Sequence, residues 1–213
     1  MHIIGYHGTK VDVDDFTTSD ISVDRMVGPH FSKTPALANR FALKNPGRKG
    51  HGKRYGGRVI PVRLAGGIYQ VNQHYADFPG AYSQLSHPET GCWIGLFAAD
   101  YHAIAHDIGK VVFPERADLV SRLAQVFGHP DAEACLAHIR NTGEWGMAGY
   151  VDLKEHRELQ ADIARAYRDI LVERGYGALQ YVNTAKKEQV GGLDDQTCYI
   201  ALTAPRFYFE AVH

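Results

Sequence analysis

Strand patterns stand at both ends of this 213-residue chain, and helical patterns fill the middle. Six short runs carry strand character: Ile3–Tyr6, Gly28–Ser32, Val59–Leu64, Ala178–Val182, Cys198–Leu202 and Phe207–Val212. Because two groups of strands frame a long helical stretch, the predicted fold class is α+β. We expect a mostly antiparallel sheet whose first and last strands meet across a cleft.

The clearest helix covers Leu153–Arg174, and Gly175 can supply its left-handed C-terminal cap. Its apolar stripe repeats at spacings of four, three and four residues: Leu159, Ile163, Ala166 and Ile170. Another helix is predicted to begin at Thr34-Pro35, because threonine suits the N-cap and proline the first helical position. The residues expected on the inner face of that helix are Ala38, Phe41 and Ala42.

The middle of the chain contains three more helical candidates, separated by Gly and Pro signals: Ile94–His106, Glu115–Phe127 and Ala132–Arg140. We interpret residues 77–150 as a helical insertion within a single domain of residues 1–213. Residues 45–57 are rich in glycine and cations, without periodicity, and are predicted to form a mobile loop.

The composition is that of an ordinary globular protein, with 45% hydrophobic and 22% charged residues and a net charge of −1. The three cysteines are spaced too widely for a zinc knuckle and are odd in number for a disulfide framework. No apolar run approaches the roughly 20 residues of a membrane span. We therefore expect a cytoplasmic protein without a membrane partner.

Two short segments carry candidate chemistry. His7-Gly8-Thr9 follows the first strand, so its imidazole can donate a hydrogen bond where glycine lets a ligand approach the backbone. Alone, this tripeptide is more typical of a capped strand end with a surface histidine. The second segment, Gly28-Pro29-His30-Phe31-Ser32, is followed by the predicted helix at Thr34-Pro35.

Together these motifs resemble the ADP-ribosyltransferase superfamily, on its diphtheria-toxin and poly(ADP-ribose) polymerase side. Those enzymes carry His-Gly-Thr or His-Gly-Ser at a strand end, and then Gly-x-Tyr-Phe-Ser/Ala before a helix with a small residue and an aromatic. Later segments also resemble family strands: residues 59–64, 174–183, and Cys198-Tyr199-Ile200-Ala201-Leu202 with Pro205. The resemblance covers roughly residues 1–69 and 153–209. It implies split antiparallel β-sheets around an NAD cleft, interrupted by the helical insertion.

The resemblance also implies a reaction in which NAD is a co-substrate and no metal takes part. Cleavage of the nicotinamide–ribose bond develops an oxocarbenium ion, so the enzyme must hold the leaving group and tolerate positive charge. His7 and His30 are the implied catalytic residues. The implied NAD-binding residues are Tyr6, Gly8, Thr9, Arg25, Phe31, Ser32, Ala38, Arg40 and Phe41. Among them the Gly8 backbone would bind the carboxamide, Phe41 would stack on nicotinamide, and Arg25 or Arg40 would pair with the pyrophosphate.

Two positions depart from the family pattern. His30 replaces the usual tyrosine, and Cys198 replaces the usual glutamate before Tyr-Ile. Strand alternation would put Gln196 on the same face as Cys198, where it can reach the cleft instead, and Glu188 is the nearest glutamate. The candidates for the third catalytic position are therefore Cys198, Gln196 and Glu188. We therefore predict transfer of a single ADP-ribose rather than chain elongation. A degenerate NAD-binding or ADP-ribose-binding module and an NAD-dependent RNA 2′-phosphotransferase remain as alternatives.

The distribution of charge predicts the acceptor. Between Asp24 and Asp77 there is no acidic residue, whereas ten lysines and arginines occur there. A segment with charge of only one sign favours binding of a polyanion near the cleft, although a solvated loop would have the same composition. The residues expected to bind nucleic acid are Lys49, Lys53, Arg54 and Arg58. The acceptor is thus predicted to be RNA or DNA rather than protein, for a bacterial or phage toxin, effector or defence factor that an antitoxin or inhibitor protein would control.

His102 and His106 have the spacing that places two imidazoles on one helix face. No glutamate follows His102, so the His-Glu-x-x-His pattern of zinc proteases is absent. We interpret both histidines as structural.

Overall fold

The computed structural model describes residues 2–9, 16, 27–44, 57–71, 102–142, 157–183 and 191–208. The chain divides into two compact units. The first, the sheet unit, contains residues 1–19, 28–70 and 171–213, and the second, the helical unit, contains residues 20–27 and 71–170. The helical unit is thus wider than the insertion expected from the sequence, and it takes in most of the helix predicted at Leu153–Arg174.

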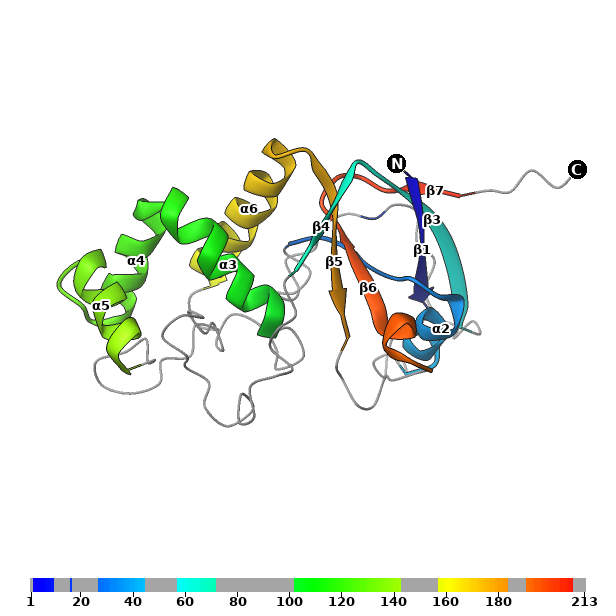
Figure 1. Ribbon diagram of the computed structural model, residues 1–213, viewed down its shortest axis with the longest axis horizontal. Helices are drawn as coiled ribbons and strands as arrows, with labels where there is room; N and C mark the ends of the chain where they lie inside the picture. The colour runs from blue at the N-terminus through cyan, green and yellow to red at the C-terminus, as the bar shows by residue number, and fades with distance from the viewer. Residues whose placement is uncertain are drawn as a thin grey trace, which may run out of the picture. The chain divides into compact units, whose positions relative to one another are not determined.

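The sheet unit contains a seven-stranded mixed sheet in the order β4-β5-β6-β2-β1-β3-β7 (Figure 1). Its strands are β1 (His2–Thr9), β2 (His30–Ser32), β3 (Arg58–Ala65), β4 (Gly67–Gln70), β5 (Tyr176–Val182), β6 (Thr197–Ala201) and β7 (Arg206–Phe207). The α+β prediction agrees with this architecture. Strand β4 was not predicted, and its pairing with β5 is parallel, whereas all other neighbours are antiparallel.

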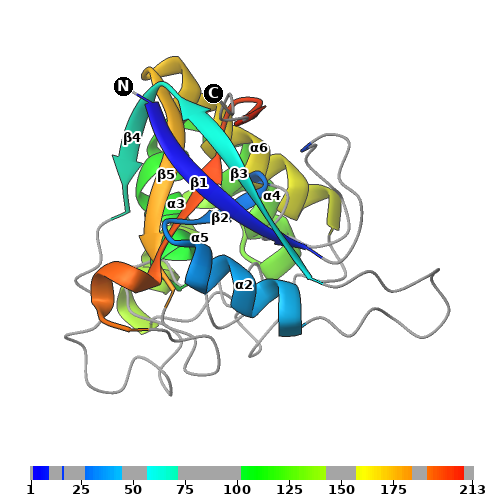
Figure 2. The ribbon, with the colours of Figure 1, turned by 90° about the vertical axis from the view of Figure 1, so that its right-hand side faces the viewer.

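The strand register is uneven across the middle of the sheet. β1 and β3 pair over their whole length, from His2–Ala65 to Thr9–Arg58 (Figure 2). By contrast, β1 and β2 share the single register pair Tyr6–Ser32. The strands β4-β5-β6-β2 and the strands β1-β3-β7 therefore meet at one narrow junction.

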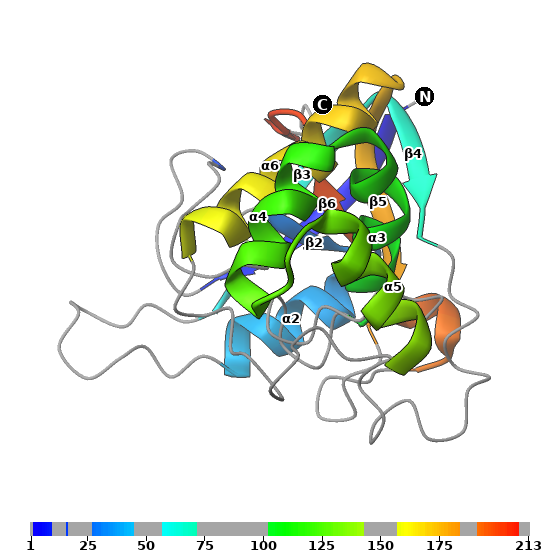
Figure 3. The same ribbon diagram turned by 90° about the vertical axis from the view of Figure 1, so that its left-hand side faces the viewer.

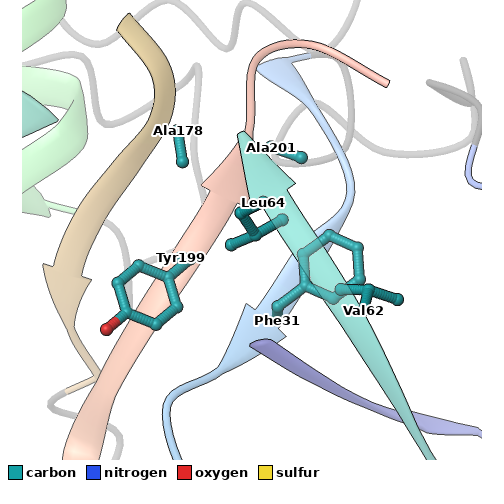
Figure 4. Close-up of a cluster of buried hydrophobic side chains, with 6 residues drawn as sticks. All are labelled: Phe31, Val62, Leu64, Ala178, Tyr199 and Ala201. Carbon is teal, nitrogen blue, oxygen red and sulfur yellow. The ribbon is translucent and has the colours of Figure 1, made fainter. Parts of the chain in front are cut away.

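The core of the sheet unit lies on the face that carries Phe31 (Figure 4). Six buried side chains from β2, β3, β5 and β6 form it: Phe31, Val62, Leu64, Ala178, Tyr199 and Ala201. Phe31 and Tyr199 are direct cross-strand partners, so their rings lie on the same face. Burying each large apolar side chain contributes about 1.5–3 kcal/mol, so this cluster fixes the relative register of β2 and β6.

Helix α2 (Pro35–Lys44) begins where the sequence predicted it. The Leu37 N–H donates to the Thr34 hydroxyl at 3.3 Å, as expected for an N-cap threonine before a first-turn proline. Ala38 and Ala42 are buried and Phe41 is half-buried, which confirms the predicted inner face. The helix packs against β1, so the second motif is joined to the first by tertiary contact.

The helical unit contains α3 (His102–Glu115), α4 (Ala117–Phe127), α5 (Ala132–Thr142) and most of α6 (Arg157–Glu173) (Figure 3). The helices predicted at 115–127 and 132–140 are confirmed. The helix predicted at 94–106 is misplaced, because α3 continues through Gly109 to Glu115, while residues 94–101 lie outside the described residues. Its buried residues Ile104 and Ile108 recur at helical spacing, so core packing outweighs the cost of a helical glycine.

Helix α6 confirms the strongest periodicity in the sequence. Its predicted stripe of Leu159, Ile163, Ala166 and Ile170 is buried. Tyr167 donates a hydrogen bond to the Asp107 carboxylate at 2.5 Å, and this buried contact ties α6 to α3. Gly175 has a φ of 87°, and its N–H donates to the Val172 carbonyl at 2.9 Å, which confirms the predicted cap. Among the described residues, no helix combines the length and the apolar character that crossing a membrane requires.

Candidate functional site

The three motif segments lie on three neighbouring strands. His7 is on β1, His30 begins β2, and Cys198 is on β6, in the spatial order β6-β2-β1. Ser32 pairs with Tyr6 on one side and with Cys198 on the other. Segments that are far apart in the chain therefore meet within two strand spacings, or about 10 Å.

The imidazole of His7 is anchored at the junction of β1 and β2. Its Nδ1 lies 3.0 Å from the carbonyl oxygen of His30. A carbonyl only accepts hydrogen bonds, so Nδ1 carries the hydrogen and donates it to the His30 carbonyl. The ring also packs against Phe16 and Phe31, with centroid distances of 5.1 and 5.8 Å.

The imidazole of His30 contacts a tyrosine that sequence reasoning did not assign. The Nδ1 of His30 and the hydroxyl of Tyr181 form a hydrogen bond of 2.9 Å, and the rings meet edge to face at 85°. Tyr181 lies on β5 and is 4% exposed, so its hydroxyl is held in place by packing. The signal was present in the sequence, because Tyr181 closes the run at 174–183 on which the family resemblance partly rests.

The two imidazoles project from opposite faces of the sheet. The ring of His7 packs on Phe31, whereas His30 precedes Phe31 and so points to the other face. Tyr181 and Cys198 are direct partners on the His30 face. The sequence predicted both imidazoles in one cleft. For the rings this prediction is wrong: the structure joins the two segments through the His30 carbonyl, but the imidazoles project from opposite faces because they differ in strand parity relative to Phe31.

The third position of the family pattern has no accessible side chain. Cys198 is 2% exposed and lies in register between Ser32 and Tyr181. Gln196 ends the short 3-10 helix η4 (Leu193–Gln196), is 4% exposed, and accepts the Asn183 N–H at its carbonyl at 2.9 Å. Glu188 lies outside the described residues. The polar group that meets His30 is therefore the Tyr181 hydroxyl.

Gly8 has a packing reason to be glycine. A Cβ at this position would lie 1.8 Å from the carbonyl oxygen of Ala38 and 2.9 Å from the backbone nitrogen of Ala42. Helix α2 therefore approaches β1 so closely that any side chain at position 8 would displace it. The carboxamide-binding role of the Gly8 backbone stays a prediction, and the packing reason stands without it.

The other residues predicted to bind NAD have different exposures. Thr9 and Ser32 are 7% and 2% exposed, Tyr6 and Phe41 are half-buried, and Arg40 is exposed. Phe31 and Ala38 belong to the packed interior of the sheet unit. Arg25 lies outside the described residues.

Of the residues predicted to bind nucleic acid, Arg58 is described, and it is exposed at the first position of β3. Lys49, Lys53 and Arg54 lie outside the described residues, as does the loop predicted at 45–57 except for Gly57. The side chains of His102 and His106 are also outside them. Within the described part of the chain, no three His, Cys, Asp or Glu side chains are grouped closely enough to hold a metal ion.

Comparison of the chain with protein-family models, with curated proteins and with solved structures finds no match.

Proposed function

We propose that this protein transfers ADP-ribose from NAD to a macromolecular acceptor, with nucleic acid favoured over protein. The observation that carries the proposal is the adjacency of β1, β2 and β6, because each bears one of the three motifs that resemble ADP-ribosyltransferases. The single Tyr6–Ser32 pair between β1 and β2 adds support, since it divides the strands into two groups as split sheets would be divided. We infer an ADP-ribosyltransferase-like fold on the same grounds.

The proposed reaction breaks the bond between nicotinamide and ribose. The bonding electron pair leaves with nicotinamide, the ribose carbon forms a bond to a nucleophile of the acceptor, and that nucleophile releases its proton to water. His7 is the residue that we infer to hydrogen-bond a ribose hydroxyl, and the bond from its Nδ1 to the His30 carbonyl orients the ring. Tyr181 is a positioning residue for His30 on the opposite face of the sheet from the His7 ring, because its hydroxyl fixes the orientation of the His30 ring.

A second candidate is an NAD-binding or ADP-ribose-binding module without turnover. It is favoured by the burial of Cys198, which leaves the third position without a carboxylate or any exposed side chain. The two candidates share a ligand and differ in whether nicotinamide is released.

A test with NAD labelled in the adenylate phosphate separates the candidates. The purified chain is incubated with RNA, DNA or cell-extract protein, and label transfer and nicotinamide release are measured. We expect His7→Ala to reduce transfer about 100-fold, the loss typical of a residue that stabilises a transition state. His2→Ala is the matched control, because His2 is an exposed histidine on the same strand.

Each outcome has one interpretation. Binding of NAD without nicotinamide release supports the module, and loss of a 2′-phosphate from RNA supports the phosphotransferase. Absence of both binding and release in the wild-type chain would refute the proposal. For a toxin, effector or defence factor, expression of the wild-type chain should arrest growth, and His7→Ala should restore it.

A further inference from the structure

Two arginines face each other across the edge of the sheet. Arg63 on β3 is the register partner of Arg206 on β7, and both side chains are exposed. β7 is the outermost strand at this end of the sheet. Like charges directly opposite each other in an antiparallel pair destabilise the sheet. Folding therefore gives no reason for this pair.

The pair is not neutralised within the described part of the chain. Neither guanidinium forms an ion pair there. In the helical unit, by contrast, exposed arginines sit beside carboxylates, as Arg165 does beside Asp162. Arg63 belongs to the stretch between Asp24 and Asp77 that contains no acidic residue. The positive charge at this edge is thus available to a negatively charged partner.

The ring of Tyr208 lies beside the arginine pair. The guanidinium of Arg63 lies 5.4 Å from the ring centroid of Tyr208. The Tyr208 N–H donates to the Pro61 carbonyl at 3.1 Å, so the pairing of β7 with β3 continues through Tyr208. Tyr208 and Arg206 are two residues apart and share a face. Two guanidinium forks and a half-buried tyrosine ring thus lie together on one surface.

This surface is on the His30 face of the sheet. Arg63 pairs with Ile4, and Tyr6 lies two residues further along β1 on the same face. Tyr6 pairs with Ser32, which lies two residues from His30. From strand spacing and rise per residue, the arginine pair is roughly 16 Å from His30.

We propose that Arg63, Arg206 and Tyr208 form a docking surface for single-stranded nucleic acid. Guanidinium forks match phosphate oxygens, and an aromatic ring gives an unpaired base a face to stack on. An acidic protein would match the charges but has no unpaired base to stack on the exposed part of the Tyr208 ring, which already packs against Arg63. Binding of the strand to this surface does not depend on the proposed function. The further statement that the bound strand accepts ADP-ribose rests on the proposed function.

The test is a fluorescence anisotropy titration of a labelled RNA strand of about 20 nucleotides, without NAD, since single-strand sites cover roughly 4–16 nucleotides. The variant Arg63→Gln/Arg206→Gln should weaken binding about 25-fold at 0.1 M salt. It should also lower the slope of log affinity against log salt by about 1.4, because each phosphate contact on a single strand contributes about 0.7. Tyr208→Ala should weaken single-strand binding about fivefold or more and leave duplex binding unchanged.

The matched control is Arg165→Gln/Arg168→Gln on α6, which changes the net charge by the same amount. It should change RNA affinity less than twofold. All variants are first checked by thermal melting, where Arg63→Gln/Arg206→Gln should melt within about 2 °C of wild type, because loss of the repulsion between the arginines offsets loss of the Arg63–Tyr208 contact.

Three results would overturn the proposal. These are failure of the wild-type chain to bind RNA or DNA strands, an equal loss of affinity in the α6 control, and equal displacement of RNA by polyglutamate of the same charge. RNA binding without NAD turnover would reject the proposed function and leave this inference standing. NAD turnover with RNA binding unchanged in Arg63→Gln/Arg206→Gln would reject this inference alone.

Discussion

Replacement of Gly8 by alanine tests the packing of α2 on β1. The new Cβ would lie 1.8 Å from the Ala38 carbonyl oxygen, whereas real Cβ contacts stay above 3.0 Å. The helix or the strand must therefore move by about 1.2 Å. The atoms in the way belong to helix backbone, so rotation of a side chain cannot relieve the contact.

The magnitude follows from two opposing effects. Overpacking costs about 1–3 kcal/mol, and we take the upper end because backbone is displaced. Loss of glycine from the unfolded chain offsets this by about 0.4–1 kcal/mol. We expect the free energy of unfolding to fall by about 2 kcal/mol, which lowers Tm by about 4–8 °C in a chain of this size.

The assay is thermal and urea unfolding followed by circular dichroism, with Gly192→Ala as the matched control. Gly192 has no neighbouring atom within 4 Å of its Cβ position and no left-handed φ, so its replacement should leave Tm within about 2 °C. An unchanged Tm for Gly8→Ala would refute the packing argument. If Gly8→Ala left Tm unchanged but abolished NAD binding, the glycine would be needed for the close approach of the ligand rather than for helix packing.

Two further predictions concern buried groups. Tyr181→Phe should lower the free energy of unfolding by about 1 kcal/mol and slow nicotinamide release, because His30 loses the hydrogen bond with the Tyr181 hydroxyl. The control Tyr176→Phe, on the same strand, should change neither quantity. Equal effects of the two variants would reject the positioning role of Tyr181. Burial raises the pKa of the Cys135 thiol to about 11, from 9.0, so peptide-resolved alkylation at pH 8 should leave this cysteine unmodified in the folded chain. Because the pKa of this thiol is higher in the folded chain than in the unfolded chain, the stability that it contributes is complete below pH 9 and is lost as the pH rises toward 11. Alkylation of Cys135 in the folded chain as fast as in the unfolded chain would contradict its burial.

Local signals in the sequence predicted most of the elements. Thr34 and Pro35 placed the start of α2 because capping depends on neighbouring residues alone, and the same holds for the Gly175 cap of α6. Helix α3 was misplaced because glycine and proline are signals for the end of a helix, whereas α3 runs through Gly109 and contains Pro114 in its last turn.

The arrangement of the candidate site was less predictable, because it depends on strand order. The sequence placed His7 and His30 near each other through a family resemblance, but the faces from which they project follow from the register with Phe31. Tyr181 could not be paired with His30 without knowing that β5 and β2 both flank β6. The pairing of Arg63 with Arg206 likewise depends on β7 joining the edge of the sheet.

The parallel pairing of β4 with β5 limits how this protein can be shortened. Antiparallel neighbours can be joined by a two-residue hairpin, but parallel neighbours require a connection that runs back along the sheet, usually a dozen residues or more. In this chain the return path passes through residues 71–170. A truncated protein that replaced that segment by a tight turn would invert one strand, whereas a helical crossover of ordinary length would preserve the direction of both.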